Sequence, residues 1–430
     1  MMSEKYVVEG SGEFDIGIPG VWSFPNYGTA LTQFALYTFV KSYGLRVLMI
    51  ERPMCAEKPP TGKLDMFETI PYDLNEIAPV YPNLKSMYRL NDLCKMFLIG
   101  SDQMFNNYLY NSFGRFIVLD WVRSNKRKVG YACSFGFDYI FGSEFDRAEM
   151  QRCIKHFYSF SVREKSGIQL VKKEFDLDVQ CVLDPVFMCD RKVFIEMGER
   201  TQNYFEWDDR KYIFAYIIDP DDKKENLLKA LSIKYAMPVC AVSDAEYDVD
   251  TVSLKWSFPT LKKISVERWI KLIRNAEYIV TDSFHGTAFS LILHKQFVSI
   301  PNEKRGRTRF ESILGIVDLL DRMVEEDVES IANLLEKRID YLKVEKILDE
   351  NRKFSKKWFE KNVFENQCKL SFSDYDAINV RCDWVEDDMI RRINEVKQEQ
   401  KKVEEQVNRK YEELMSEIRK MKKMNLKIDD

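Results

Sequence analysis

Short runs of β-branched and aromatic residues alternate with stretches of helical periodicity over most of the first 300 residues. The first half is expected to contain strands at 15–22, 46–51, 95–100, 128–134, 160–163 and 179–183, and helices at 28–43, 144–155 and 164–175. A Pro-rich stretch at 53–82 is expected to form loops. Strands that alternate with helices typically build a parallel sheet covered by helices. The pattern therefore predicts an α/β fold.

The same alternation resumes after a polar stretch at 190–209, which we interpret as the crossing into a second half. Strands are expected at 212–218, 238–243, 278–281 and 297–300, and helices at 222–235, 265–275 and 286–294. Ser265 with Arg268 makes a poor capping box, so the start at 265 is weakly signalled. Two such halves predict two Rossmann-like domains facing one cleft, over 1–189 and 190–325, followed by a helical extension over 326–385. The pattern does not specify the strand order.

The composition changes to Glu, Lys, Arg and Gln from Glu386 onward. Apolar residues spaced three and four apart mark one seam, and Gln400 fills a seam position; they are Ile393, Val396, Val403, Val407, Tyr411, Leu414, Ile418 and Met421. Two successive steps of four around Val407 form a stutter. The spacing predicts a long helix in a coiled coil over 386–430. The alternative is a single amphipathic helix packed on the body or on a membrane surface.

Composition excludes several classes of protein. With only three histidines, a multi-histidine metal centre would need nearly all of them, and no metal is expected. A balance of 65 Lys and Arg against 69 Asp and Glu argues against a nucleic-acid binder. Nine cysteines without a C-x-x-C pair indicate reduced, buried thiols. No secretory signal or membrane-spanning run is visible, so we expect a soluble, cytoplasmic protein, with peripheral membrane contact left open.

Among the histidines, His285 is the best placed for chemistry. It lies in the segment T-D-S-F-H-G-T, residues 281–287, which follows a strand and opens a helix. Ligands of open α/β sheets bind beyond the carboxyl ends of strands, and a helix start favours an anion. His285 is therefore a candidate general acid or base; the alternative is a core histidine bonded to a backbone carbonyl. For His156 and His294, positions at helix ends favour structural roles.

Charged residues follow several other strands. A loop after the strand at 297–300 carries Lys304, Arg305, Arg307 and Arg309, a suitable clamp for phosphate and carboxylate. The alternative is a solvated loop. Asp102 could orient a hydroxyl or act as base, or be a turn residue or cap. Arg163 stands at a strand-to-helix junction, where a helix-start salt bridge is the alternative. Neither G-x-G-x-x-G nor a Walker motif occurs, which disfavours NAD and P-loop chemistry.

Taken in order, the motifs of the chain resemble those of the polysaccharide pyruvyltransferase family, from about residue 14 to residue 322. The matching segments are N-Y-G-T-A-L at 26–31, G-S-D-Q at 100–103, Y-A-C-S-F-G at 131–136, S-V-R-E-K-S-G at 161–167, V-L-D-P at 182–185, T-D-S-F-H-G-T at 281–287 and the arginines before Phe310. The family often has tryptophan where Phe105 stands. The tail after Glu386 lies outside the family core.

The resemblance implies a GT-B-like fold and transfer of the enolpyruvyl group of phosphoenolpyruvate to two hydroxyls of a sugar. The product is a pyruvate ketal in a cell-envelope or capsular glycan, or in its lipid-linked precursor, with release of phosphate. Family members generally need no metal or organic cofactor. We expect the protein to lie in the cytoplasm, including the inner face of the membrane, and to form a homo-oligomer or bind a partner through the coiled coil.

Roles follow for the candidate residues. We expect His285 to protonate the methylene carbon, with Asp282 orienting it or raising its pKa, and Asp102 to act as the base facing the acceptor. The group expected to bind phosphoenolpyruvate is Arg163, Ser283, Gly286, Thr287, Lys304, Arg305, Arg307 and Arg309. The group expected to bind the acceptor is Asn26, Tyr27, Gln103, Phe105 and Ser134.

Two other functions fit the sequence. A glycosyltransferase of the same fold would take a nucleotide sugar as its donor. A non-catalytic scaffold would use the heptad tail to assemble a glycan-synthesis complex.

Overall fold

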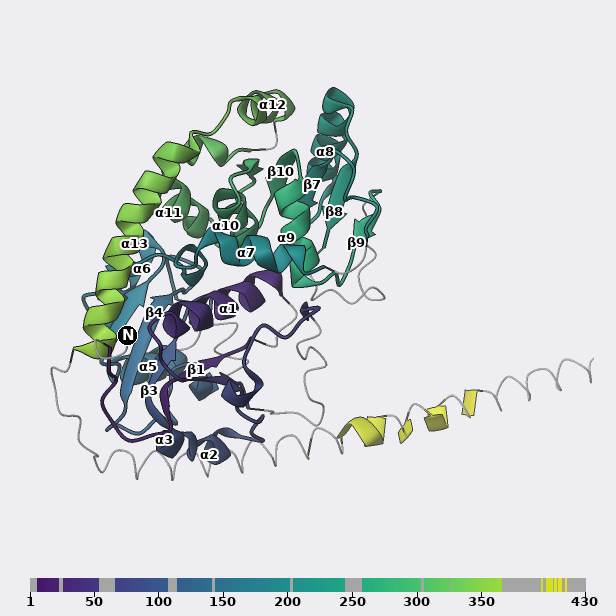
Figure 1. Ribbon diagram of the computed structural model, residues 1–430. Helices are drawn as coiled ribbons and strands as arrows, with labels where there is room; N and C mark the ends of the chain where they lie inside the picture. Colours follow the sequence, from purple (N-terminus) through teal and green to yellow (C-terminus); the bar gives the residue numbers. More distant parts are fainter. Residues whose placement is uncertain are drawn as a thin grey trace, which may run out of the picture. The chain divides into compact units, whose positions relative to one another are not determined.

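The computed structural model describes residues 6–22, 26–53, 66–106, 114–140, 144–201, 204–243, 257–302, 305–325 and 327–365, together with scattered positions between 396 and 415. It divides into two units, Met1–Ser373 and Asp374–Asp430, which are considered separately. The first unit contains both sheets (Figure 1).

The first sheet has six parallel strands in the order β2-β1-β3-β4-β5-β6. Its strands are β1 (Phe14–Gly20), β2 (Val47–Glu51), β3 (Cys94–Ile99), β4 (Arg127–Cys133), β5 (Ser159–Val162) and β6 (Gln180–Cys181). The strand order reverses between β1 and β3. Ligands of open α/β sheets bind at such a reversal, beyond the carboxyl ends of the strands.

The second sheet has five parallel strands in the order β11-β10-β7-β8-β9, and its order reverses between β7 and β10. Its strands are β7 (Ile213–Tyr216), β8 (Val239–Val242), β9 (Thr260–Leu261), β10 (Tyr278–Thr281) and β11 (Gln296–Ser299). Two parallel sheets with helical crossovers confirm the predicted α/β class and the GT-B-like pair of Rossmann-like halves.

Helices connect the strands of both sheets. In the first half these are α1 (Tyr27–Lys41), α2 (Leu84–Met87), α3 (Leu90–Leu93), α5 (Glu144–Ile154), α6 (Lys165–Phe175) and the short 3-10 turns η2 (Leu74–Glu76), η3 (Gly114–Phe116) and η4 (Pro185–Phe187). In the second half they are α7 (Arg191–Glu199), α8 (Asp222–Tyr235), α9 (Val266–Asn275), α10 (Phe284–Ile292), α11 (Thr308–Ile316), η6 (Leu320–Arg322), α12 (Val328–Glu336) and α13 (Tyr341–Phe364).

Side-chain caps fix where several helices begin. The Asn26 side chain accepts a hydrogen bond from Thr29 N at the start of α1. Ser265 does the same for Arg268 N at the start of α9, so the weakly signalled start is a true cap. Such caps satisfy backbone donors that have no partner within the helix.

Two expectations about elements were wrong. The polar stretch at 190–209 is not a plain crossing, because α7 occupies Arg191–Glu199 and buries Phe194 and Met197. The helix expected from Gly286 begins two residues earlier, at Phe284, with Ser283 as its cap. His285 therefore lies in the first turn of α10.

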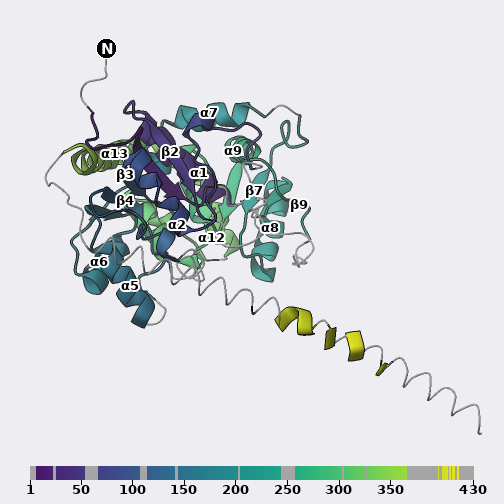
Figure 2. The same ribbon diagram turned by 90° about the horizontal axis from the view of Figure 1, so that it is seen from below.

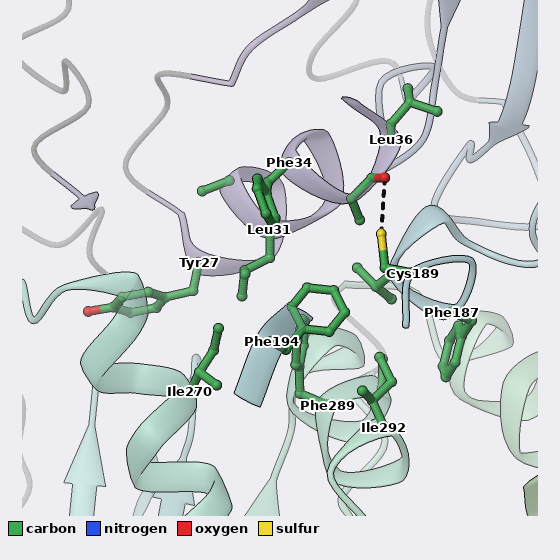
Figure 3. Packing of buried hydrophobic residues seen from close by; sticks show 14 of the residues in the cluster. Tyr27, Leu31, Phe34, Leu36, Phe187, Cys189, Phe194, Ile270, Phe289 and Ile292 are labelled. Carbon is green, nitrogen blue, oxygen red and sulfur yellow. Dashed lines mark hydrogen bonds between the residues drawn. The ribbon is translucent and has the colours of Figure 1, made fainter. Parts of the chain in front are cut away.

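One hydrophobic core joins the two halves. Tyr27, Leu31 and Phe34 of α1 face Phe194 of α7, Ile270 of α9 and Phe289 and Ile292 of α10, as Figure 3 shows. Tyr27 stacks on Trp269 with ring centroids 5.5 Å apart. This shared packing fixes α1 of the first half against the helices that carry the second sheet's site residues.

The chain returns to the first half through α13, which runs beside β4 (Figure 1 and Figure 2). Ser355 of α13 accepts a hydrogen bond from Leu183 N at 2.9 Å, and Arg127 donates to the Val363 carbonyl at 2.7 Å. The expected helical extension is thus helical over α12 and α13, while 366–385 lies outside the described residues.

In the second unit, the described positions between 396 and 415 are helical. The apolar residues Val396, Val403, Val407, Tyr411 and Leu414 are each 57–62% exposed. Ile393, Ile418 and Met421 of the expected seam lie outside the described residues. Within the described part of the chain, no helix is both long and apolar enough to cross a membrane.

Candidate functional site

The reversal points of the two sheets meet at His285. The imidazole Nε2 of His285 lies 2.8 Å from Thr32 Oγ1 on α1. A Cβ atom on Gly28, one turn earlier, would collide with the same ring, so only glycine permits this approach. His285 is 5% exposed. The helix starts of α1 and α10 therefore converge on one buried imidazole.

Asp102 lies beside them, just beyond the end of β3. It accepts hydrogen bonds from Thr29 Oγ1 at 2.5 Å and from its neighbour Gln103 N at 2.8 Å. Burial alone would raise the pKa of Asp102, but His285, Arg163 and these hydrogen bonds lower it to about 2. Its φ of 57° is left-handed, a conformation that Asp tolerates better than most residues. Asp102 is thus an ionised carboxylate aimed at the site.

Arg163, beyond the end of β5, is a buried and compensated cation. Its side chain is 1% exposed, and its Nη1 donates to Asp184 Oδ2 at 2.7 Å. Its Nη2 lies 3.5 Å from Asp102 Oδ1. The guanidinium stacks over the Phe284 ring, 4.6 Å from its centroid. Asp184 in turn accepts from Ser101 Oγ at 2.9 Å. These contacts hold Arg163 in one position.

Arg309 of α11 is a buried cation without a carboxylate partner in the described ranges. It is 7% exposed, donates to the Arg305 carbonyl, and leaves its Nε without a hydrogen bond. Its guanidinium lies 5.5 Å from the centroid of the same Phe284 ring. Burial and the charge of Arg163 lower its pKa to about 9, so it keeps its proton at neutral pH. Because a buried charge without a partner costs free energy, a bound anion would stabilise Arg309 in this position.

The charge of His285 depends on this surrounding cluster. Burial is the largest effect and, with Arg163 and Arg309, lowers the pKa of His285 to about 4 against the opposing pull of Asp102 and Asp184. The imidazole is therefore neutral at neutral pH in the absence of a ligand. An anion bound beside it would raise this pKa, because negative charge favours the imidazolium form.

Glu164 is a site neighbour that the sequence did not single out. It is 2% exposed, and its carboxyl pairs with Ser134 Oγ through a short hydrogen bond. Burial raises its pKa, against the opposing effects of Arg163 and the Ser134 bond. Its Oε2 lies 4.0 Å from Arg163 Nε and has no hydrogen-bond partner among the residues that the structure describes. Glu164 directly follows Arg163 in the S-V-R-E segment, which was the available signal.

Asp282 does not orient His285. Its carboxylate accepts from Ile218 N at 2.6 Å and Asp219 N at 3.1 Å, and pairs with Lys224 Nζ at 3.2 Å. Burial raises the pKa of Asp282, opposed by Lys224 and these backbone donors. Asp282 thus pins the loop after β7 to β10. The carboxylates that act on His285 are Asp102 and Asp184 instead.

Only part of the expected cation clamp converges on the site. Arg305 pairs with Asp219, with Nε 2.8 Å from Oδ2. Arg307 pairs with Glu311 at 2.8 Å, one helical turn along α11. Lys304 lies outside the described residues. Arg163 and Arg309 are the two cations that the fold brings together, because both stack on Phe284.

Ser283, Gly286 and Thr287 make contacts that hold α10 in place. Ser283 Oγ accepts from Gly286 N at 3.3 Å, and Thr287 Oγ1 lies 2.6 Å from Ser299 Oγ. A Cβ on Gly286 would collide with Thr281 Oγ1, so glycine lets α10 approach β10. These contacts set the position of His285.

The group expected to bind the acceptor needs correction. Tyr27 and Phe105 are both fully buried in cores, Tyr27 against Trp269 and Phe105 against Phe135 and Phe160, so neither presents a surface to an acceptor. An aromatic side chain gains most when it is buried, and the fold uses both for packing.

The remaining members have local roles. Asn26 caps α1, and Ser134 holds Glu164. Gln103 Nε2 donates to the Arg305 carbonyl at 3.0 Å and so joins the two halves.

The other histidines lie elsewhere. His294 stacks on Tyr341 at 4.5 Å and bonds Glu345 at 2.8 Å. His156 is exposed and lies two residues after the end of α5, where its backbone N–H donates to the Cys153 carbonyl. Across the described ranges, no group of three or more His, Cys, Asp or Glu side chains is placed to hold a metal ion.

The protein therefore has an α/β fold of two Rossmann-like halves that share one buried site. Two arginines, Arg163 and Arg309, make this site suitable for an anion. The family model for Polysaccharide pyruvyl transferase matches residues 26–304, and the chain belongs to this family. The match extends into both halves and includes Asp102, Arg163, Asp184 and His285, while Arg305, Arg307 and Arg309 lie beyond it. No curated protein sequence matches the chain significantly.

Several solved structures are similar to the chain. UDP-GlcNAc 2-epimerase of Methanocaldococcus jannaschii is 11% identical with a TM-score of 0.47, covering 78% of this chain and 98% of that one. UDP-N-acetylglucosamine 2-epimerase from Rickettsia bellii is 11% identical with a TM-score of 0.47, covering 81% and 98%. A wall teichoic acid polymerase is 11% identical with a TM-score of 0.41, covering 88% of each chain.

Proposed function

We propose that the protein transfers the enolpyruvyl group of phosphoenolpyruvate to two hydroxyls of a sugar, forming a pyruvate ketal and releasing phosphate. One observation carries this proposal: Arg309 is a buried guanidinium that forms no hydrogen bond or ion pair with a carboxylate among the described residues, and it shares the Phe284 ring with Arg163. Phosphoenolpyruvate offers the phosphate and the carboxylate that two such cations would bind.

The chemistry needs a proton for the methylene carbon. As that carbon gains a proton, the second carbon becomes electrophilic and a sugar hydroxyl attacks it. The bond to the phosphate oxygen then breaks, and the second hydroxyl closes the ketal ring. Of the two protons that the hydroxyls lose, one is balanced on the new methyl group and the other on the phosphate. Holding both hydroxyls beside one carbon makes ring closure effectively intramolecular.

His285 and Asp102 suit the two proton transfers. Asp102 is ionised and can take a proton from the attacking hydroxyl. His285 is neutral before the substrate binds, so the proton must arrive with the anionic substrate, whose charge raises the imidazole pKa. The proposal thus includes proton uptake on binding. Isothermal titration with phosphoenolpyruvate in two buffers of different ionisation enthalpy would measure it.

The decisive experiment is mass spectrometry of candidate envelope glycans incubated with phosphoenolpyruvate and the full chain. The proposal expects the mass increment of a pyruvate ketal and an equal amount of phosphate. His285→Gln should fold normally and abolish both products. Turnover at the wild-type rate in that variant would remove His285 from the mechanism.

A thermal-shift screen separates the proposal from a nucleotide-sugar glycosyltransferase. Phosphoenolpyruvate should raise the melting temperature of the wild type, because a ligand that binds only the folded state stabilises it. Stabilisation by UDP- or GDP-sugars without any effect of phosphoenolpyruvate would contradict the proposal. The family's sugar acceptor supports a cytoplasmic enzyme working at the inner face of the membrane, which cell fractionation would test.

A further inference from the structure

An open cavity of about 780 Å³ lies at the carboxyl end of the second sheet. Its walls come from the first turns of α8, from the residues after β11 and from the segment that leads into α12. Small-ligand sites commonly have volumes of roughly 300–1,000 Å³. The cavity is therefore large enough for a ligand, and neither the ketal chemistry nor the residues around His285 account for it.

The cavity adjoins the polar network that holds the loop after β7. Lys223 lines the cavity, while its neighbour Lys224 pairs with Asp282. Pro301 lines the cavity, while the side chain of its neighbour Asn302 donates to Asp219 at 2.6 Å. Residues adjacent to the cavity lining thus contact Asp282 and Asp219, so the cavity lies on the same sheet edge as the segment 281–287 that carries His285.

The lining has an apolar floor and a polar rim without net charge. The floor includes the buried residues Leu227, Ile300 and Val324, and the rim includes Lys223, Asn226, Arg307, Glu325 and Asp327. The described rim residues include two cations, Lys223 and Arg307, and two carboxylates, Glu325 and Asp327. A nucleotide diphosphate would require an excess of cations. A neutral sugar instead uses carboxylate and amide groups as hydrogen-bond partners for its hydroxyls, while its C–H face packs on the floor.

We propose that this cavity is the subsite for a neutral sugar unit of the acceptor. The inference rests on the proposed function and gives the acceptor a place that the buried Tyr27 and Phe105 do not provide. The acceptor extends along the sheet edge, with its reacting hydroxyls near Arg309 and a further sugar unit in the cavity. Asn226 and Glu325 position that unit by hydrogen bonds, while Arg163 and Arg309 bind the donor.

Saturation-transfer NMR on the full chain tests the subsite without any turnover. The probes are lactose, cellobiose and N,N′-diacetylchitobiose, with UDP-glucose for comparison. Asn226→Trp fills the cavity and Glu325→Gln removes a charged acceptor. Glu329→Gln is the matched control, because Glu329 is exposed on α12 and does not line the cavity. We expect at least one disaccharide to bind the wild type and the control, and to bind Glu325→Gln about fivefold more weakly. Asn226→Trp should abolish binding.

Three outcomes would overturn the subsite: no disaccharide binds the wild type, binding survives Asn226→Trp, or UDP-glucose binds in the cavity more tightly than the sugars. None of them requires phosphoenolpyruvate, so the subsite can fail while ketal formation is observed, and the reverse also holds. If ketal formation is observed, Glu325→Gln should raise the KM for the glycan and leave the KM for phosphoenolpyruvate unchanged.

Discussion

The two sheet edges that meet at the candidate site each carry a buried arginine, and the two arginines differ in their carboxylate partners. At the first edge, Arg163 is paired with Asp184 and lies close to Asp102. At the second edge, Arg309 is equally enclosed but no described carboxylate pairs with it. A compensated cation stabilises the fold, whereas an uncompensated one costs stability until an anion arrives. We therefore expect Arg163 to stabilise the fold as well as to bind the donor, whereas Arg309 contributes to binding alone.

Arg309→Met tests this difference most strongly. Loss of the unpaired cation should lower kcat/KM for phosphoenolpyruvate on the order of 100-fold to 1,000-fold, as is usual for a group that stabilises developing charge. The folded protein should be no less stable, because a buried charge has been removed. Phosphate-release kinetics and urea denaturation measure both. Arg338→Met, on an exposed residue, is the control. Unchanged kinetics in Arg309→Met would show that Arg309 does not bind phosphoenolpyruvate.

Arg163→Met, unlike Arg309→Met, should lower the free energy of unfolding. Its removal leaves Asp184 buried without its cation, and breaking such a pair typically costs roughly 3–5 kcal/mol of the free energy of unfolding. Urea denaturation of this variant beside Arg309→Met measures the contrast. If both variants were equally destabilised, the distinction between a paired and an unpaired arginine would be wrong.

His285 links stability to pH at the second edge. In the unfolded chain a histidine titrates near its ordinary pKa of 6.5, whereas folded His285 stays neutral down to about 4. As pH falls through this window, the unfolded state binds a proton that the folded state does not, so stability is lost. The contribution is fully present above pH 6.5. His285→Gln should therefore flatten the pH dependence of the free energy of unfolding between these values, measured by denaturant titration.

Thr32 tests the contact between the two edges. Thr32→Val keeps the shape of the side chain but removes the hydroxyl that meets His285 Nε2, with an expected cost of about tenfold in kcat. Thr32→Ser should restore most of the activity. Nitrogen NMR shifts of the imidazole report its tautomer directly. Retention of both rate and tautomer in Thr32→Val would show that the contact does not position His285.

The smallest effect on activity is expected from the tail. Deleting everything after Glu386 should leave the kinetics with phosphoenolpyruvate within about twofold, because the site lies wholly in the first unit. If the seam around Val403 and Val407 pairs with another helix, as the heptad spacing predicts, light scattering should show fewer subunits per particle after the deletion. An unchanged number of subunits would show that the tail has no role in assembly.

Much of this protein was readable from the sequence alone. The alternation of elements predicted the α/β class, and the order of motifs indicated the family. The position of His285 between a strand and a helix predicted its place at a sheet edge. These features are local, because periodicity and strand-to-helix junctions are properties of neighbouring residues.

The pairing of charges and the burial of Tyr27 and Phe105 could not be predicted from the sequence. Asp282 binds the loop after β7 rather than His285. Arg305 pairs with Asp219, while Arg309 forms no ion pair with a carboxylate among the described residues. These contacts could not be read from the sequence because hydrogen bonds, ion pairs and burial depend on residues brought together from distant parts of the chain. The spacing of cations from 304 to 309 carries no information about which of them the fold will leave unpaired.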